Sequence, residues 1–303
     1  MRANILTTIL LLFCFFTKAQ NCELSYTNEI KKIAINDSLT IAYKEQGKGK
    51  RTFLMIHGLG GNLTHWSHNF IENEHCIALD LPSYGLSTMR VFQAKTDLLD
   101  FYAETILAFI QKKKLQNVVL VGHSMGGQIA IIMALKNPKS IKKLVLVSPA
   151  GFETFEDNEA KALLSFSKPE TFKNQNEAMV RIGFKRNFYE MPTSTETLIQ
   201  DRLIIGKCEK FNPYFQAVAG GVKGMLEHPV RKELNKIVIP TLVVFGENDE
   251  LIPNKFLHKS LTTSQIAEIG KEIPNVQTVL IPKAGHLVMY EQSQIFNQLV
   301  KRF

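Results

Sequence analysis

The sequence is poor in cysteine, and no two cysteines stand in a CxxC arrangement. Cys14 lies in the apolar N-terminal stretch, and Cys22, Cys76 and Cys208 follow it. Without cysteines at metal-ligand or redox spacing, neither a zinc site nor a thioredoxin-type redox site is expected. In an oxidising compartment two of the last three could form a disulfide, and one would be left over. Cys76 opens an apolar run, so we expect it to be a buried free thiol.

The chain has no apolar run that spans a bilayer comfortably. The N-terminal run, residues 5–16, has 12 residues, whereas a membrane-spanning helix needs about 20. It follows a basic start at Arg2 and precedes the small residue Ala19, which is typical of a secretory signal peptide. We therefore predict cleavage after Ala19, a secreted or periplasmic location, and no stable membrane insertion of the mature chain. The alternative is an uncleaved anchor.

Concentrated charge of one sign is also missing. The chain carries 36 Lys and Arg against 28 Asp and Glu, a net charge of +8. The lysines are scattered, and the run at 112–114 stands where a predicted helix ends. No nucleic-acid-binding signature is present, so we expect no nucleic-acid partner.

Short apolar segments recur along the chain and predict buried β-strands. They are residues 52–57, 76–80, 117–122, 143–148, 241–245 and 276–281. Because nearly every position is apolar, rather than alternate ones, we expect each strand to be buried on both faces. Residues 30–35 and 39–43 alternate around Asn36-Asp37-Ser38, which predicts a β-hairpin.

Helical patterns separate these strands. We expect helices at residues 97–113, 126–136 and 292–303. This alternation predicts an α/β fold, with a mostly parallel central sheet and helices on both faces. Residues 152–234 contain no strand-like run and are too long for a plain loop. We interpret them as a helical cap inserted into a core of residues 20–151 and 235–303. Helical candidates within the cap are 159–166, 176–188 and 195–205.

The strongest local motif is Gly122-His123-Ser124-Met125-Gly126, which follows a predicted strand and precedes a predicted helix. This is the G-x-S-x-G nucleophile elbow in the context that it requires. The turn is so tight that only small residues fit two positions before and after the serine. The serine hydroxyl then stands at a helix N-terminus, which favours developing negative charge. We predict that Ser124 is a catalytic nucleophile.

A serine nucleophile needs a histidine base held by a carboxylate, in the chain order Ser, acid, His for this motif. Among eight histidines, only His286 lies in a glycine-containing loop after the last strand and before the last helix. We predict Asp249 as the acid, because sheets of this kind place function at the carboxyl ends of strands. The alternatives are Glu247 and Glu250 in the same loop, and Glu153 or Asp157 after an earlier strand.

Two backbone N–H donors are needed for the oxyanion of a tetrahedral intermediate. We predict Met125, directly after the nucleophile, and Leu59 in the glycine-rich loop 57–61. His65 and His68 lack a neighbouring carboxylate cluster, so we interpret them as a helix surface rather than a metal site. We expect no metal and no cofactor.

Several segments together resemble the α/β-hydrolase superfamily, in particular its capped esterase, lipase and C–C hydrolase branch. They are residues 57–61, 80–87, 122–127, 246–249 and 285–286. The resemblance runs from about residue 30 to the C-terminus, is weakest in the cap, and implies the triad Ser124, Asp249 and His286. Haloalkane dehalogenases and epoxide hydrolases of this fold use an aspartate nucleophile, so Ser124 argues against both. Met125 stands where proline peptidases of the superfamily usually have tryptophan.

The sequence therefore predicts a serine hydrolase that cleaves carboxylic esters of apolar small molecules through an acyl-enzyme on Ser124. The alternative is a C–C bond hydrolase of the meta-cleavage-product type, which would use the same triad. A non-catalytic ligand receptor of the same fold is a third interpretation, which the intact triad disfavours. The phenylalanines of residues 152–234 either line an acyl pocket or form the core of the cap.

Overall fold

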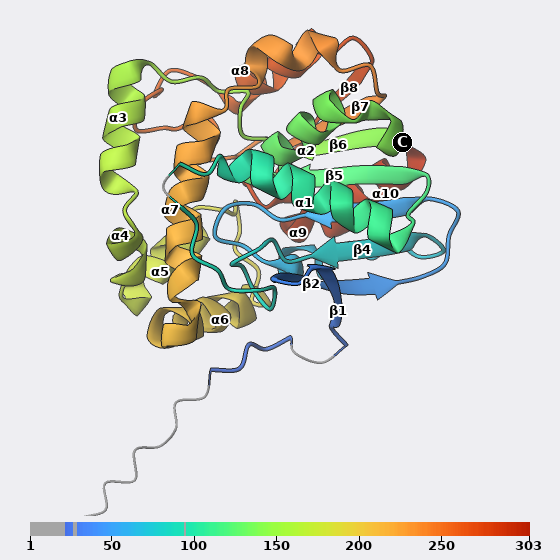
Figure 1. Ribbon diagram of the computed structural model, residues 1–303. Helices are drawn as coiled ribbons and strands as arrows, with labels where there is room; N and C mark the ends of the chain where they lie inside the picture. The colour runs from blue at the N-terminus through green and yellow to red at the C-terminus, as the bar shows by residue number, and fades with distance from the viewer. Residues whose placement is uncertain (1–21, 27–28, 94) are drawn as a thin grey trace, which may run out of the picture.

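The computed structural model describes residues 22–26, 29–93 and 95–303, so the predicted signal peptide lies outside the described residues. Within these ranges the strands form one sheet in the order β1-β2-β4-β3-β5-β6-β7-β8 (Figure 1). The strands are β1 (Lys31–Asn36), β2 (Leu39–Gln46), β3 (Thr52–Ile56), β4 (His75–Leu79), β5 (Val118–His123), β6 (Lys143–Val147), β7 (Thr241–Gly246) and β8 (Val276–Ile281).

The sheet is parallel from β4 through β8 and antiparallel only at the β1–β2 edge. β3 pairs in parallel with both β4 and β5, and the parallel pairing continues through β6, β7 and β8. β1 and β2 form the predicted hairpin, and β2 lies antiparallel to β4. The predicted fold class and the positions of the predicted strands are confirmed, and β3 to β7 are almost wholly buried, as long apolar runs between helices favour. The expectation that each strand is buried on both faces is wrong for β8, which is mostly half-buried because it lies at the edge of the sheet.

Successive residues of each central strand contribute to two separate cores. In β3, Leu54 and Ile56 face the first core, and Phe53 and Met55 face the second. The first core is covered by α1 (Leu98–Lys113), α2 (Met125–Lys136) and α8 (Thr263–Glu268). The second is covered by the 3-10 turn η1 (Leu63–Trp66), α9 (Val288–Glu291) and α10 (Ser293–Arg302). Helices therefore lie on both faces of the sheet, as predicted.

Further helices lie between β6 and β7 and gather at one side of the sheet in Figure 1. They are α3 (Asp157–Phe166), α4 (Pro169–Lys173), α5 (Glu177–Lys185), α6 (Thr195–Lys207) and α7 (Asn212–Glu227). We call them the α3–α7 segment.

Helix α7 was missed by the sequence analysis because its glycines hide the helical pattern. A Cβ atom at Gly221 would lie 2.7 Å from the Leu59 side chain and 2.9 Å from that of Met125. At Gly224 it would lie 2.5 Å from Leu99 of α1. These glycines weaken the intrinsic helix propensity. In return, they let α7 lie directly against the core, beside the loop that carries Leu59.

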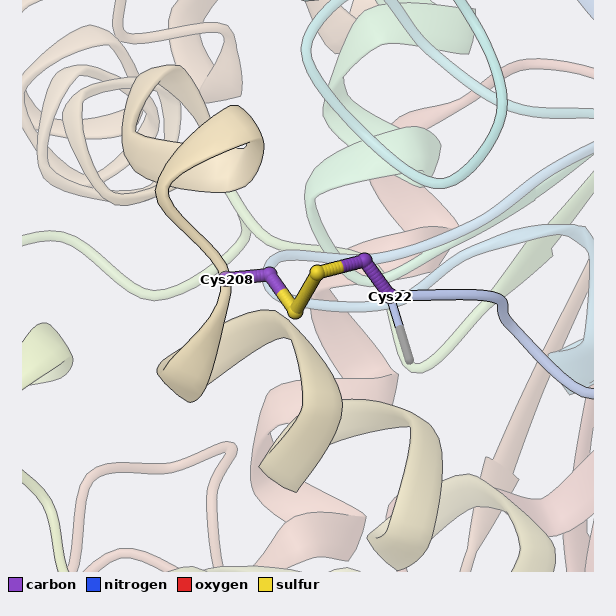
Figure 2. Close-up of a disulfide and its surroundings, with 2 residues drawn as sticks. All are labelled: Cys22 and Cys208. Carbon is purple, nitrogen blue, oxygen red and sulfur yellow. A yellow bond between two sulfur atoms is a disulfide. The ribbon is translucent and has the colours of Figure 1, made fainter. Parts of the chain in front are cut away.

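The N-terminal segment ties α6 to the core. Cys22 forms a disulfide with Cys208, the residue that follows α6, across a sequence separation of 186 residues (Figure 2). Ser25 donates two hydrogen bonds of 2.7 Å to Asp201 of α6, one from its backbone N–H and one from its hydroxyl. Cys76, the other cysteine in the described part of the chain, is buried and free, as predicted.

We expect the Cys22–Cys208 disulfide to stabilise the fold strongly, because it closes a long loop in the unfolded chain. Cys22→Ser together with Cys208→Ser should lower the free energy of unfolding by about 2–4 kcal/mol, measured by urea unfolding. Reductant should lower the stability of the wild type to that of the double variant and leave the variant unchanged. Equal stability of the two oxidised proteins would contradict this prediction.

Candidate active site

Ser124 occupies a strained turn between β5 and α2. Its backbone has φ 53° and ψ −118°, a conformation that costs a non-glycine residue about 1–3 kcal/mol. A Cβ atom at Gly122 would lie 2.3 Å from the carbonyl oxygen of Gly126, and one at Gly126 would lie 2.6 Å from that of His57. The two glycines of the motif are therefore required by backbone contacts.

Asp249 and His286 come together from the ends of β7 and β8. His286 Nδ1 donates to Asp249 Oδ2 over 2.8 Å, and both side chains are buried. The other oxygen of Asp249 accepts from the N–H groups of Leu251 and Ile252. These bonds hold the carboxylate in place and occupy Nδ1 of His286, which lines the same cavity as Ser124.

The other acids considered in the sequence lie elsewhere. Glu247 and Glu250 are exposed, and so is Asp157 at the start of α3. Glu153 is buried, but it accepts from the backbone N–H of Asn254 and pairs with His258 Nδ1 over 2.5 Å. Glu153 thus anchors the loop that follows Asp249 and does not contact His286.

His123, next to the nucleophile, supports the His286 loop and was not singled out in the sequence. Its ring centroid lies 4.7 Å from that of His286, and its Nε2 donates to the His286 carbonyl oxygen over 3.1 Å. Burial lowers the pKa of His123 well below its ordinary value, so the ring is neutral. Its place inside the G-x-S-x-G motif is the one sequence signal for this role.

The glycine-rich loop is fixed beside Ser124 by His57. The His57 Nδ1–H donates to the Gly58 carbonyl oxygen over 2.7 Å, and Nε2 accepts from the Leu81 N–H over 3.1 Å. A Cβ atom at Gly58 would lie 3.0 Å from the Ser124 Cβ, so this loop passes directly over the nucleophile. Leu59, the next residue, lines the cavity of Ser124.

Met125 is buried as the first residue of α2. The oxyanion-binding role of the Leu59 and Met125 N–H groups stays a prediction, and so does the catalytic role of the triad.

The cavity at Ser124, called here the Ser124 cavity, has a volume of about 390 Å³. Its walls are largely apolar, and none of its lining residues is lysine or arginine. Apolar lining residues include Phe155, Leu163, Val222, Met225, Leu226 and Ile252. Glu153 also borders it.

A second cavity of about 210 Å³, the α5 cavity, lies beside the first and shares Leu59, His65 and Asn187 with it. Its lining includes Phe172, Phe184, Arg202 and Tyr214.

The phenylalanines of residues 152–234 divide between the two cavities and the two cores of the sheet, and their role in binding an acyl group stays a prediction. Phe155 lines the Ser124 cavity, and Phe172 and Phe184 line the α5 cavity. Buried phenylalanines of the same stretch are Phe152, Phe188, Phe211 and Phe215. Phe166 is exposed.

The structure places the side chains of the segment 65–68 in different surroundings. Trp66 packs against Phe296 of α10 in the second core. The prediction that His65 lies on a helix surface is wrong: its side chain is buried between the two cavities, because the turn η1 faces the sheet. His68 is exposed.

Among residues 22–26, 29–93 and 95–303, no group of three His, Cys, Asp or Glu is placed to hold a metal ion. In the same residues, no helix has the length and apolar character needed to cross a membrane.

We expect His57 to make the fold sensitive to acid. Burial lowers its pKa to about 4, so between pH 4 and 6.5 the folded protein binds fewer protons here than the unfolded chain. The free energy of unfolding should therefore fall with decreasing pH in that window, by up to about 1.4 kcal/mol per pH unit from this residue. Urea unfolding from pH 4.5 to 6.5 should show a shallower slope for His57→Gln than for the wild type. His68→Gln is the matched control, and an equal change in both variants would contradict the assignment.

Comparison with known proteins agrees with this architecture. A curated relative, the 2-hydroxy-6-oxononadienedioate/2-hydroxy-6-oxononatrienedioate hydrolase of Paraburkholderia phymatum, is 25% identical over 284 residues, 88% of this chain and 91% of that protein. A probable hydrolytic enzyme from Pseudomonas aeruginosa superposes with a TM-score of 0.78 at 20% identity, covering 92% of this chain and 95% of that one.

A thermophilic esterase from Thermogutta terrifontis superposes with a TM-score of 0.70 at 22% identity, covering 90% and 97% of the two chains. At these identities the two solved structures show a shared fold. The family model of the alpha/beta hydrolase fold matches residues 51–293, which is most of the sequence. The chain therefore belongs to the α/β-hydrolase fold family.

Proposed function

We propose that this protein is a serine hydrolase that cleaves carboxylic esters of uncharged, largely apolar small molecules. One observation carries the proposal: Ser124, on its strained elbow, shares a largely apolar cavity with a histidine that is hydrogen-bonded to a buried aspartate. Nucleophile, base and orienting carboxylate in this order are the requirements for acyl transfer. The relatives named as hydrolases and esterases support the same reaction class.

In the proposed mechanism, His286 Nε2 removes the proton from Ser124 as the serine oxygen attacks the ester carbonyl. The Leu59 and Met125 N–H groups stabilise the oxyanion, and Asp249 orients His286 and stabilises its charged form. His286 then protonates the leaving alcohol, and its departure leaves the acyl group bound to Ser124 as the acyl-enzyme. Water, activated by the same histidine, releases the acid and regenerates Ser124.

Cleavage of a C–C bond in a dioate, as the name of the Paraburkholderia relative describes, is the second candidate. The charge of the site favours esters over such a substrate. A dioate brings two carboxylates, and the Ser124 cavity offers no lysine or arginine and already contains Glu153. Arg202 in the α5 cavity is engaged with the Phe172 carbonyl oxygen and with Gln175, and lies over the rings of Tyr214 and Phe215.

We also propose that the α3–α7 segment acts as the cap that shapes substrate access, and that the protein works in a secreted or periplasmic location. Leu163 of α3 and Met225 of α7 border the Ser124 cavity, which supports a role in substrate selection. The Cys22–Cys208 disulfide supports an oxidising compartment, where such bonds form and persist.

We expect Ser124→Ala to remove activity without unfolding the protein. The wild type should react with a fluorophosphonate probe and hydrolyse p-nitrophenyl butyrate, whereas the variant should remain unlabelled and lose at least about 10⁴-fold in kcat. Ser148→Ala is the matched control, because Ser148 is a buried serine directly after β6. Labelling of Ser124→Ala at the rate of the wild type would overturn the proposal.

We expect the wild type to prefer neutral acyl groups over anionic ones of the same length. Its kcat/KM for p-nitrophenyl butyrate should exceed that for p-nitrophenyl hemisuccinate by about tenfold or more, because the second carboxylate would be buried without a cationic partner. A preference for hemisuccinate, together with turnover of a dioate meta-cleavage product, would instead favour the C–C hydrolase.

A further inference from the structure

His65 is a buried histidine to which the proposed mechanism gives no role. It belongs to the turn η1 and lines both the Ser124 cavity and the α5 cavity. Its side chain is only slightly exposed, and its Nδ1 has no hydrogen-bond partner in the described part of the chain. A buried polar atom without a partner is uncommon and calls for an explanation.

One side of the His65 ring packs closely against Gly61. A Cβ atom at Gly61 would lie 2.7 Å from His65 Nδ1 and 2.6 Å from Cε1, so that edge of the ring packs against the glycine backbone. Because Nδ1 is buried at this contact, Nε2, on the other side of Cε1, is the polar atom of the ring left to border the cavities that His65 lines. The turn itself is held by Asn62, which accepts from the Thr64 N–H, and by Asp80, which accepts from the Leu63 N–H.

His65 is also uncharged. Burial, together with the nearby His57 and His286, lowers its pKa to about 3. A neutral imidazole has one N–H and one lone pair. Placing the N–H on Nδ1 would bury a donor without an acceptor, which costs more than leaving a lone pair there. The proton therefore belongs on Nε2, where it is the donor available to the two cavities that His65 lines.

We propose that His65 determines substrate specificity by donating a hydrogen bond from Nε2 to an oxygen of the substrate close to the scissile ester carbonyl. The substrate class is then an ester with an ether, hydroxyl or keto oxygen near that carbonyl, in its acyl or its alcohol part. This inference rests on the proposed ester hydrolysis. His65 lies between the two cavities and beside the loop that carries Leu59. Its donor is therefore placed near the point at which the acyl and the alcohol part of a bound ester separate.

Two pairs of isosteric esters test this assignment. The acyl pair is p-nitrophenyl methoxyacetate and p-nitrophenyl butyrate, and the alcohol pair is 2-methoxyethyl butyrate and butyl butyrate. In each pair one member has an oxygen where the other has a methylene group. His65→Leu should lower the kcat/KM ratio of the oxygenated to the plain ester by about three- to tenfold in at least one pair. His65→Gln, which keeps an N–H donor, should restore part of it.

His68→Leu is the matched control, since His68 is exposed three residues further along and lines neither cavity. Because His65 stays neutral, the kcat/KM ratio of the oxygenated to the plain ester should be constant for the wild type between pH 6 and 9. Protonation of the catalytic base changes kcat/KM for both esters equally and leaves their ratio unaffected. Thermal unfolding of each variant checks the fold.

The role of His65 would be overturned if His65→Leu left the kcat/KM ratio of the oxygenated to the plain ester unchanged in both pairs. This includes the case in which the variant loses kcat/KM equally for both esters of a pair. A wild type that hydrolyses no ester and leaves the fluorophosphonate probe unreacted would overturn the proposed function itself. These failures are distinguishable because the first requires measurable turnover of the plain esters.

Discussion

The tight backbone packing around Ser124 is the constraint on which the rest of the site depends. Gly122 and Gly126 are in contact through their backbones, and Gly126 in turn touches the carbonyl of His57 at the end of β3. This places a strained serine directly after β5, at the start of α2. A side chain at Gly122 would clash with α2, and one at Gly126 would clash with the backbone at the end of β3, so either would displace α2 and move the nucleophile.

The loops around the nucleophile are held mainly by buried groups that do not themselves react. His57 joins the glycine-rich loop to Leu81, His123 holds the backbone of His286, and Glu153 holds Asn254. Asp80 accepts from Leu63, Leu86 and Tyr26, and burial raises its pKa to about 7. Neutral histidines and bonded carboxylates suit this task, because a buried polar group is tolerated when its hydrogen bonds are made.

The α3–α7 segment joins the core at both of its sides. Glu291 of α9 accepts from the N–H groups of Gly285, Tyr189 and Glu190, which connects the His286 loop to the residues after α5. On the other side, the segment 22–26 connects α6 to the core through the disulfide and Asp201. The residues after α5 are therefore held to the core by hydrogen bonds, and α6 is held by a covalent bond as well.

The sequence by itself determined the features that depend on local pattern. Continuous apolar runs gave the parallel strands, the glycines around Ser124 marked the elbow, and the positions of Asp249 and His286 after two later strands marked their place in the site. Tertiary structure alone decided the partners that lie far apart in the chain. The pairing of Cys22 with Cys208, the burial of His65 between two cavities, and the contact of Glu153 with His258 leave no periodic trace in the sequence. Helix α7 belongs with these, because its glycines are favourable only where α1 and the Leu59 loop approach it closely.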